Sequence, residues 1–387
     1  MIWCYNAGCF GYGVLERNKK KMKEILISGY YGFKNSGDDA LLKSITDNLK
    51  KEHPDYKIVV LSKNPEETEK NYGVKAIKRT NPFSVLFHGA KAKLLVSGGG
   101  TLIQDATSTK SLIYYLAIMW IAKLFGAKVM LYANGIGPVN QEENRKRTTK
   151  ILNRTDAITL RDERSYEETK NLGITKPEIL VTADPVFLID GADKDRGWEI
   201  LKKAGVLENK KILGISLREW KRADADFNKK ITDAIETVCR KTNLYPVFLP
   251  LQPKDFEICE KISKGLSTDS VVIKDSLSVE DVLAVVKNFH IAMGMRLHSL
   301  IYSASCAVPV VGISYDPKVS GFMEYAKQDK FVNAEDLDKE KLIADTLFIY
   351  ESYDEIKNVL TKTADFMKEK AEKNCEVVAR LLAEDKK

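Results

Sequence analysis

The chain has 387 residues, of which 44% are hydrophobic and 30% are charged, and its 61 Lys and Arg residues exceed its 54 Asp and Glu residues by seven. This length predicts two domains, because single cores rarely grow beyond about 250–300 residues, and the apolar content excludes a largely disordered chain. The basic residues are scattered among acidic ones, so we expect no nucleic-acid partner.

Cysteine usage and the apolar runs indicate a cytoplasmic protein. The six cysteines are Cys4, Cys9, Cys239, Cys259, Cys306 and Cys375. They form no CxxC pair and no Cys/His cluster with zinc-like spacing, so we expect reduced thiols. The longest apolar run, Leu112 to Ala122, is shorter than the ~20 residues that a membrane-spanning helix needs. We expect it to form a core helix.

The first 21 residues differ from the rest of the chain. Residues 1–21 show no apolar periodicity and end in a lysine run, whereas Met22 leads directly into a strand pattern. No small-residue cleavage site follows an apolar core, which argues against a signal peptide. We expect a leader at 1–21 that is either disordered or the product of a misassigned start, with Met22 as the natural first residue.

The first domain opens as a strand, a glycine-rich loop and a helix. Glu24 to Ser28 predicts a buried strand, and the loop from Gly29 to Asp39 contains three glycines that let a ligand approach the backbone. Its spacing matches neither a dinucleotide fingerprint nor a P-loop. Asp38 or Asp39 is either the N-cap of the following helix or part of a carboxylate pair that faces a cleft.

Five further strands are predicted in this domain, each followed by a loop and a helical segment. They are Lys57–Ser62, Leu94–Ser97, Ala127–Ala133, Ala157–Leu160 and Ile179–Thr182. This alternation predicts a doubly wound parallel sheet of six strands. The loops after the strands should therefore share one edge, including the Ser97–Asp105 loop, whose three glycines could instead be a tight packing point.

A second series of alternating elements follows the polar segment Asp190 to Gly197, which we interpret as a linker. Its predicted strands are Ile212–Leu217, Tyr245–Leu249, Val271–Ile273, Ile291–Met293 and Val308–Ile313. The predicted domains are therefore 22–189 and 190–345, both Rossmann-like and facing a central cleft, with a helical tail at 346–387. This arrangement is the GT-B-like α/β architecture.

Three cations follow strands of the second domain. Arg218, Arg296 and Lys318 all occupy strand ends, where open α/β sheets bind ligands, so together they predict an anion pocket. Arg296 belongs to the turn Gly294–Ser299, which also contains His298. An arginine fork matches carboxylate or phosphate oxygens, and a histidine can move a proton near neutral pH. The alternative is a surface arginine beside a packed histidine.

Four motifs occur in order at these strand ends. They are Tyr30-Tyr31-Gly32-Phe33-x-Asn35-x-Gly37-Asp38-Asp39, Ser97-Gly98-Gly99-Gly100-Thr101-Leu102-Ile103-Gln104-Asp105, Asn134-Gly135-Ile136-Gly137-Pro138 and Gly294-Met295-Arg296-Leu297-His298-Ser299. They resemble the polysaccharide pyruvyltransferase family, and most of all its CsaB type, which is associated with cell-wall polymers that anchor S-layer proteins. The resemblance extends from Met22 to about Asp385.

The resemblance implies transfer of a pyruvyl group from phosphoenolpyruvate to two hydroxyls of a sugar, with release of phosphate. It implies that Arg296 and His298 contact phosphoenolpyruvate, and Arg218 matches a third family position; Lys318 completes the expected donor set. The implied acceptor is similar to N-acetylmannosamine on a lipid-linked glycan precursor. The residues that we expect on the acceptor side are Tyr31, Asn35, Gly37, Gly99, Gly100, Gln104, Asp105 and Asn134.

The chemistry of ketal formation suits these residues. The enol carbon must be protonated, and His298 is our candidate general acid, either at the methylene carbon or at the leaving phosphate, because its pKa can lie near the working pH. Asp38, Asp39 or Asp105 could deprotonate the sugar hydroxyls or position the sugar, so the predicted catalytic set is His298, Arg296, Asp38 and Asp39. We expect no cofactor besides the co-substrate and no obligatory metal, because no carboxylate cluster has clear ligand spacing.

Two other functions fit the same architecture. A glycosyltransferase with a nucleotide-sugar donor would be stabilised by a nucleotide diphosphate and not by phosphoenolpyruvate. A non-catalytic glycan-binding protein would bind glycan without turnover. A lipid-linked acceptor would require peripheral contact with the inner face of the plasma membrane, which the aromatic loop of Tyr30, Tyr31 and Phe33 would permit; that loop could equally stack on a sugar.

Overall fold

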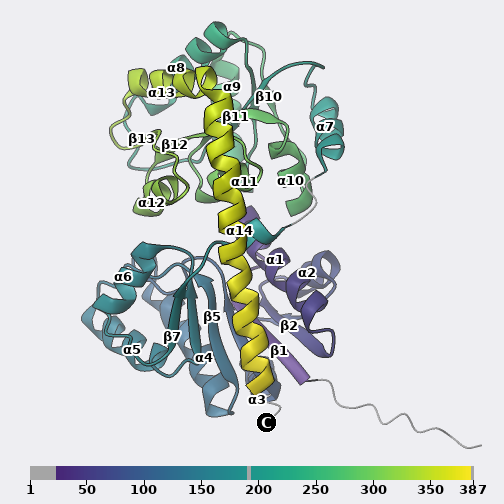
Figure 1. The fold of residues 1–387 in the computed structure, drawn as a ribbon, viewed down its shortest axis with the longest axis vertical. Coiled ribbons are helices and arrows are strands. Elements are labelled where there is room, and N and C mark those ends of the chain that lie inside the picture. The colour runs from purple at the N-terminus through teal and green to yellow at the C-terminus, as the bar shows by residue number, and fades with distance from the viewer. Residues whose placement is uncertain (1–22, 190–192, 385–387) are drawn as a thin grey trace, which may run out of the picture.

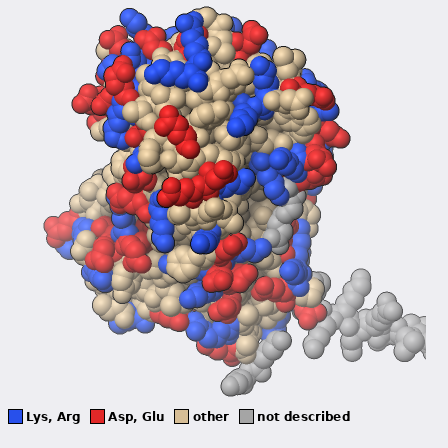
Figure 2. Space-filling view, turned by 45° about the horizontal axis from the view of Figure 1, so that its top comes forward, with Lys and Arg blue, Asp and Glu red and all other residues tan. Residues whose placement is uncertain are grey.

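The computed structural model describes residues 23–189 and 193–384, so the predicted leader lies outside the described residues. The chain forms two α/β domains, one above the other in Figure 1, each built on a parallel sheet. The predicted fold class is confirmed. Figure 2 shows Lys and Arg mixed with Asp and Glu over one face of the molecule.

The first sheet has seven strands in the order β3-β2-β1-β4-β5-β6-β7, all parallel. They are β1 (Lys23–Tyr31), β2 (Tyr56–Ser62), β3 (Lys75–Lys78), β4 (Ala92–Gly98), β5 (Lys128–Asn134), β6 (Ala157–Leu160) and β7 (Glu178–Val181). The expected count of six was wrong because β3 is a four-residue edge strand with lysine at both ends, which leaves almost no apolar pattern.

The second sheet has six parallel strands in the order β10-β9-β8-β11-β12-β13. They are β8 (Ile212–Ser216), β9 (Tyr245–Phe248), β10 (Val271–Val272), β11 (Phe289–Gly294), β12 (Val310–Ser314) and β13 (Phe331–Asn333). The expected count of five missed β13, which has three residues and only one of them buried.

Helices cover both faces of each sheet. Those of the first domain are α1 (Ser36–Glu52), α2 (Pro65–Tyr72), α3 (Pro82–Lys91), α4 (Thr109–Leu124), α5 (Glu142–Leu152), α6 (Glu163–Asn171) and the 3-10 turn η1 (Pro185–Leu188). Alternate residues of the central strands separate these layers: Ile25 and Ile27 join the core beneath α1, whereas Leu26 joins the core beneath α4.

The second domain has its own set of helices. They are α7 (Lys194–Lys203), α8 (Phe227–Thr242), η2 (Pro253–Asp255), α9 (Phe256–Gly265), α10 (Val279–Val286), α11 (Leu297–Ser305), α12 (Pro317–Tyr325) and α13 (Lys339–Glu351). The expected linker over Asp190 to Gly197 was wrong in its second half, because Asp193 caps α7 through the amides of Asp195 and Arg196. Residues 190–192 lie outside the described ranges.

Helix α14 (Tyr353–Glu384) joins the two domains. Its 32 residues correspond to about 48 Å of helix, and Figure 1 shows it crossing from the upper domain to the lower one. Leu360 and Met367 belong to a core of the second domain, whereas Val378 and Leu382 fill the core between β1, β4, β5 and α1. The predicted helical tail therefore packs against both domains.

The order of the strands fixes where a ligand site can form. Each sheet reverses its direction of growth once, between β1 and β4 in the first domain and between β8 and β11 in the second. The loops beyond these reversal points diverge and leave a crevice, which is where open α/β sheets bind ligands. The crevices hold the predicted loops of the first domain and the turns of Arg218 and Arg296 in the second.

Within the described ranges, no helix combines the length and the apolar composition that crossing a bilayer requires.

Candidate functional site

The turn after β11 brings the second domain against the first. Met295 and Arg296 form the turn, and α11 begins at Leu297, which places His298 in the first turn of the helix. The His298 ring lies against the backbone of Gly37 in α1, where a Cβ atom would come within 2.1 Å of the ring Nδ1. Only glycine fits at residue 37, so two of the predicted motifs meet at this contact.

Arg296 is held by an aspartate that the sequence did not single out. Its Nε and one terminal nitrogen donate hydrogen bonds to the carboxylate of Asp255, which is fully buried, and the same terminal nitrogen donates to Gln252 at 2.9 Å. The buried ion pair fixes the turn at the end of β11. The role of Arg296 in binding phosphoenolpyruvate stays a prediction.

His298 lies among cations from both domains. Burial, together with the nearby charges of Arg161, Lys318 and Arg296, lowers the pKa of His298 to about 3. This corrects our expectation that its pKa lies near neutrality, since a buried imidazole among cations resists protonation. At neutral pH His298 is therefore an unprotonated ring, which can accept a proton before it can donate one.

Asp38, in the first turn of α1, lies near the same cations, Arg161 and Lys318. Burial and, to a smaller extent, the charge of Asp39 raise the pKa of Asp38 to about 7, although Arg161 and Lys318 oppose the shift. Neither aspartate is the N-cap, because Asn35 caps α1 by accepting the amide of Gly37. The capping interpretation of Asp38 and Asp39 was therefore wrong.

Two residues that the sequence analysis did not assign complete the cluster. Arg161 follows β6 and Asp184 follows β7, and both are nearly buried. The Asp184 Oδ2 atom lies 3.9 Å from His298 Nε2 and 3.7 Å from an Arg161 nitrogen. Neither Asp184 Oδ2 nor His298 Nε2 has a hydrogen-bond partner among the described residues. Both residues carry the signal that pointed to Arg218, Arg296 and Lys318, which is a charged side chain within a few residues after the end of a strand.

Arg218 and Lys318 meet at Tyr315. The Arg218 guanidinium donates to the Tyr315 hydroxyl at 2.9 Å and stacks over its ring at 4.6 Å, and the Lys318 ammonium lies 5.8 Å from the same ring. Arg218 Nε is buried without a partner within the part of the chain that the structure describes. Arg218 and Lys318 therefore lie close together at Tyr315, and Lys318 and Arg296 lie near enough to His298 to lower its pKa. The anion pocket expected from Arg218, Arg296 and Lys318 stays a prediction.

Three of the predicted acceptor residues are bonded within the first domain. The Tyr31 hydroxyl is fully buried and donates to Gly98 O at 2.7 Å. The Asn134 amide donates to Ser97 O at 2.8 Å. Asp105 accepts the amides of Asn140 and Gln141 at 2.8 and 2.9 Å, which hold its pKa below the usual value. These side chains support the loops and line neither of the two cavities described below.

The other predicted acceptor residues have varied surroundings. Gly99 packs against Leu41, whereas a Cβ atom on Gly100 would lie 3.2 Å from Asp38 Oδ1, so Gly100 leaves room beside that carboxylate. Both have positive φ, which glycine tolerates. Gln104 lies at the rim of a cavity, with its amide nitrogen hydrogen-bonded to Thr107.

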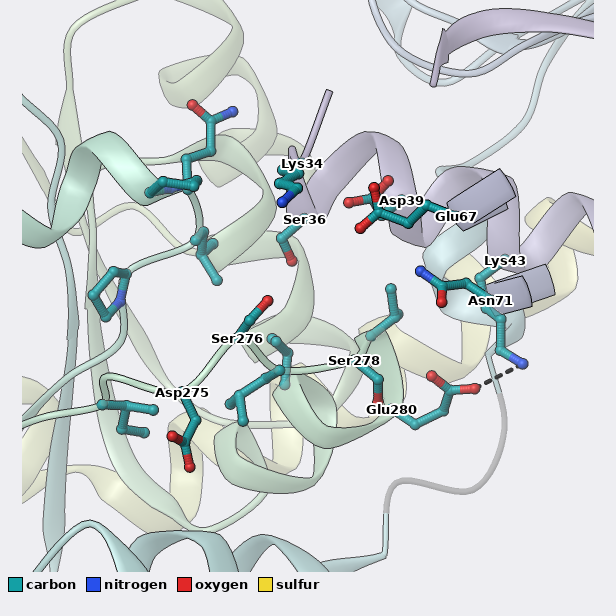
Figure 3. A pocket seen from close by; sticks show the side chains of 18 of the residues that line it. Lys34, Ser36, Asp39, Lys43, Glu67, Asn71, Asp275, Ser276, Ser278 and Glu280 are labelled. Carbon is teal, nitrogen blue, oxygen red and sulfur yellow. Dashed lines mark ion pairs between the residues drawn. The ribbon is translucent and has the colours of Figure 1, made fainter. Parts of the chain in front are cut away.

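Two cavities flank the contact between the domains. One, of about 760 Å³, is lined by Thr101, Gln104, Gly135, Arg161, Asp184 and Lys318, with α11 and α12 opposite. The other, of about 960 Å³, lies between α1, α2 and the loops after β9 and β10 (Figure 3). Asp39 lines this second cavity, where burial raises its pKa to about 6.

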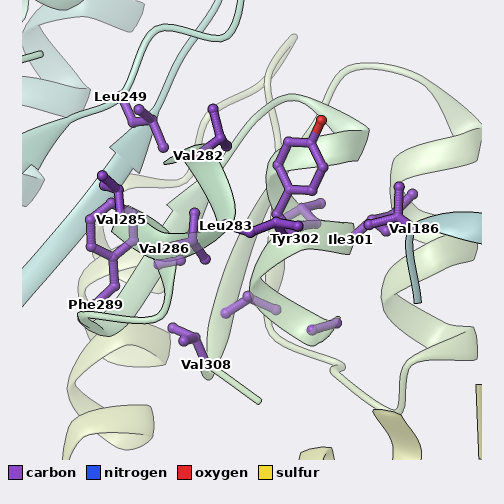
Figure 4. Packing of buried hydrophobic residues seen from close by; sticks show 14 of the residues in the cluster. Val186, Leu249, Val282, Leu283, Val285, Val286, Phe289, Ile301, Tyr302 and Val308 are labelled. Carbon is purple, nitrogen blue, oxygen red and sulfur yellow. The ribbon is translucent and has the colours of Figure 1, made fainter. Parts of the chain in front are cut away.

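The wall between the cavities is built from both domains. The Ser36 amide donates to Leu251 O at 3.3 Å, and the Tyr302 hydroxyl donates to Ser36 O at 2.6 Å. Tyr302 rises from a core that also contains Val186 of the first domain (Figure 4). The start of α1 is therefore anchored to the second domain, directly beside His298. No group of three or more metal-ligating side chains occurs in 23–189 or 193–384.

Solved structures with the same architecture support the description of the fold. The chain is similar to UDP-GlcNAc 2-epimerase from Neisseria meningitidis, with a TM-score of 0.64 at 15% identity over 94% of this chain and 100% of that chain. It is also similar to Anabaena Alr3699/HepE, with a TM-score of 0.63 at 12% identity over 93% and 99% of the two chains. At these identities the likeness concerns the fold alone.

Sequence relatives are more specific. The chain is 22% identical to the amylovoran biosynthesis protein AmsJ of Erwinia amylovora over 400 aligned positions, which cover 88% of this chain and 95% of that protein. The family model described as polysaccharide pyruvyl transferase matches residues 35–317, which include the α1 start, the Arg161 and Asp184 strand ends and the His298 turn. The chain belongs to the polysaccharide pyruvyl transferase family.

Proposed function

We propose that the donor is phosphoenolpyruvate and that the protein transfers its pyruvyl group to two hydroxyls of a sugar, forming a cyclic ketal and releasing phosphate. Membership of the family supports a pyruvyltransferase role in polysaccharide biosynthesis. The observation that carries the donor assignment is the set of cations around His298, to which Arg161, Lys318 and Arg296 contribute charge. A ligand with a carboxylate and a phosphate needs several such cations.

The two titratable groups beside the Gly37 contact suggest how protons move. In the net reaction one sugar hydroxyl proton ends on the methylene carbon and the other leaves with phosphate. Asp38, with a pKa of about 7, is partly protonated at neutral pH, whereas His298 is neutral. Groups whose environments push their pKa values apart are the usual acid and base of an active site. We therefore assign Asp38 as the proton donor to the carbon. His298 is assigned as the acceptor of a hydroxyl proton once the negative charges of bound phosphoenolpyruvate raise the low pKa of its ring, which is the reverse of the role expected for His298.

The acceptor is proposed to be a sugar of a lipid-linked cell-wall glycan precursor, as in the CsaB type. The four motifs support this finer assignment, and the relative in amylovoran biosynthesis points to an alternative acceptor from another polysaccharide. The cavity lined by Gln104, Thr101 and Lys318 adjoins the donor cations and has room for a sugar. We place the acceptor there.

Phosphate release from phosphoenolpyruvate tests the proposal. Purified protein is assayed with and without a lipid-linked N-acetylmannosamine disaccharide, beside His298→Gln and Lys318→Gln and a control, Lys264→Gln, whose side chain is exposed on α9. We expect acceptor-dependent release that falls by about 100-fold or more in the two site variants and is unchanged in the control.

Ligand-induced thermal shifts separate the rival functions. Stabilisation by phosphoenolpyruvate without turnover would support phosphoenolpyruvate as the donor and reject the proposed acceptor sugar. Stabilisation by UDP, with none by phosphoenolpyruvate, would reject the proposal in favour of a nucleotide-sugar glycosyltransferase. Glycan binding that survives in every variant, with no phosphate release from the wild type, would indicate a non-catalytic glycan-binding protein.

A further inference from the structure

One segment carries the entire excess of positive charge. The residues from Lys70 to Gln141 include nine basic side chains and one acidic one, a formal charge of +8, while the whole chain carries +7. The single acid, Asp105, is buried and bonded to backbone amides. Three of the nine basic side chains pair with acids outside the segment, Lys75 with Glu69 and both Lys123 and Lys128 with Asp156, so the local excess of positive charge is smaller than this count.

The same segment exposes large apolar side chains. Phe83 is 83% exposed, and Leu86 and Phe87 follow on the same side of α3. On α4, the side chains of Ile113, Trp120 and Leu124 are 42–60% exposed. We call these six residues the α3–α4 surface. Such positions on a helix facing water normally carry charged or polar residues.

The two helices lie against each other, so the six residues form one surface. A Cβ atom on Gly89 of α3 would contact Ile121 of α4 at 3.1 Å, and the Tyr114 hydroxyl donates to Arg79 O just before α3. Both helices pack on the face of the first sheet opposite to α14. A contiguous exposed apolar surface of this kind marks an interaction site.

Basic side chains accompany the apolar ones. The Lys91 ammonium lies 3.8 Å from the centre of the Phe87 ring. Lys78 is exposed at the end of β3, and Lys110 is exposed in the first turn of α4. Exposed aromatic and aliphatic side chains beside lysines are the composition of a surface that enters the headgroup layer of an anionic membrane.

We propose that the α3–α4 surface binds an anionic phospholipid bilayer, with α3 and α4 lying in the plane of the headgroups. This binding does not depend on the reaction. Its consequence rests on the proposed function: α4 begins directly after the loop of Gln104 and Thr107, which lines the 760 Å³ cavity, so the mouth of that cavity would open beside the bilayer. A lipid-linked sugar could then enter without leaving the membrane.

Vesicle binding tests the proposal without any substrate. Full-length protein is sedimented with vesicles of phosphatidylcholine containing about one third phosphatidylglycerol, and with pure phosphatidylcholine. The variant is Phe83→Ser/Phe87→Ser, and the matched control is Phe366→Ser on α14. Phe366 is 54% exposed, as is Phe87, and it also carries a lysine over its ring.

The double variant should bind anionic vesicles at least about tenfold more weakly than the wild type, and the control should bind equally well. Lys91→Gln/Lys110→Gln should lose about tenfold on anionic vesicles and little on neutral ones. Equal losses in the double variant and in Phe366→Ser, or no vesicle binding by the wild type, would overturn the proposal. A dimer that Phe83→Ser/Phe87→Ser dissociates, without vesicle binding, would assign the surface to a second copy of the chain.

Discussion

The two sheet edges that face each other across the cleft use their polar residues differently. On the first-domain edge, Tyr31 and Asp105 are bonded to backbone atoms of neighbouring segments of the same domain. Across the cleft, His298 and Lys318 bring charge or a free ring nitrogen to the interface. The sequence pattern thus shows that a polar residue lies at the edge of the sheet. It does not show whether the side chain is hydrogen-bonded within the protein or available to a ligand.

Loop length explains this difference. The first-domain loops are long and curve through glycines with positive φ, so their exposed amides and carbonyls need partners from nearby side chains. The turn after β11 contains only Met295 and Arg296 before α11 begins. It has few backbone groups to satisfy, so His298 projects across the cleft to Gly37.

Arg296 is an exception to this contrast, because its guanidinium is already bonded to Asp255 and Gln252 of its own domain. Arg296→Gln should destabilise the fold by about 4 kcal/mol, because it leaves the buried carboxylate of Asp255 without its partner. Urea unfolding measures this loss. The double variant Arg296→Gln/Asp255→Asn should regain most of the stability but not the turnover. If turnover returns as well, Arg296 only supports the turn and its predicted contact with the donor is wrong.

Arg161 tests whether the first domain also supplies charge to the reaction. Arg161→Gln should lower kcat/KM for phosphoenolpyruvate by about 100-fold, since a cation beside His298 and Asp38 is lost. It should also move the pH profile upward, because Arg161 opposes the rise in the pKa of Asp38. Arg154→Gln, an exposed residue before β6, is the control. An unchanged pH profile, with only reduced stability, would make Arg161 structural.

Asp38 should give the protein a stability that falls as pH rises. Its folded pKa, about 7, lies above the ordinary value of 3.8, so its stabilising contribution is fully present below about pH 4 and is lost as pH rises through 7. Asp38→Asn should therefore exceed the wild type by on the order of 2 kcal/mol at pH 8. Asp47→Asn, exposed on the same helix, should follow the wild-type slope. Parallel curves for Asp38→Asn and the wild type between pH 5 and 8 would contradict this prediction.

The smallest effect is expected at Tyr31. Tyr31→Phe removes one hydrogen bond to Gly98 O and should cost about 1 kcal/mol of stability, while KM for the sugar acceptor stays the same. Thermal unfolding and acceptor titration measure the two quantities separately. A tenfold rise in KM at unchanged stability would show that Tyr31 contacts the acceptor, and the contrast between the two sheet edges would then not hold at this residue.

The sequence predicted the fold and the location of the site better than the chemistry of its members. Long buried strands such as β1 and β5 have clear apolar runs, whereas β3 and β13 are too short and too polar to show a pattern. The ion pair of Arg296 with Asp255 and the pKa of His298 depend on which residues pack together in three dimensions. The spacing of residues along the chain does not reveal those contacts. The positions of Arg161 and Asp184 after β6 and β7 are, however, visible in the sequence and are of the same kind as those of the predicted site residues.

The position of α14 has a consequence for how the protein is made. The hydrophobic face of β4 and β5 in the first domain is closed by Val377, Val378 and Leu381, which the ribosome adds only after the whole second domain. During synthesis this face of the first sheet stays exposed to solvent until residues almost 200 codons after its last strand have been added. The nascent amino-terminal half is therefore expected to expose this apolar face until α14 has been synthesised.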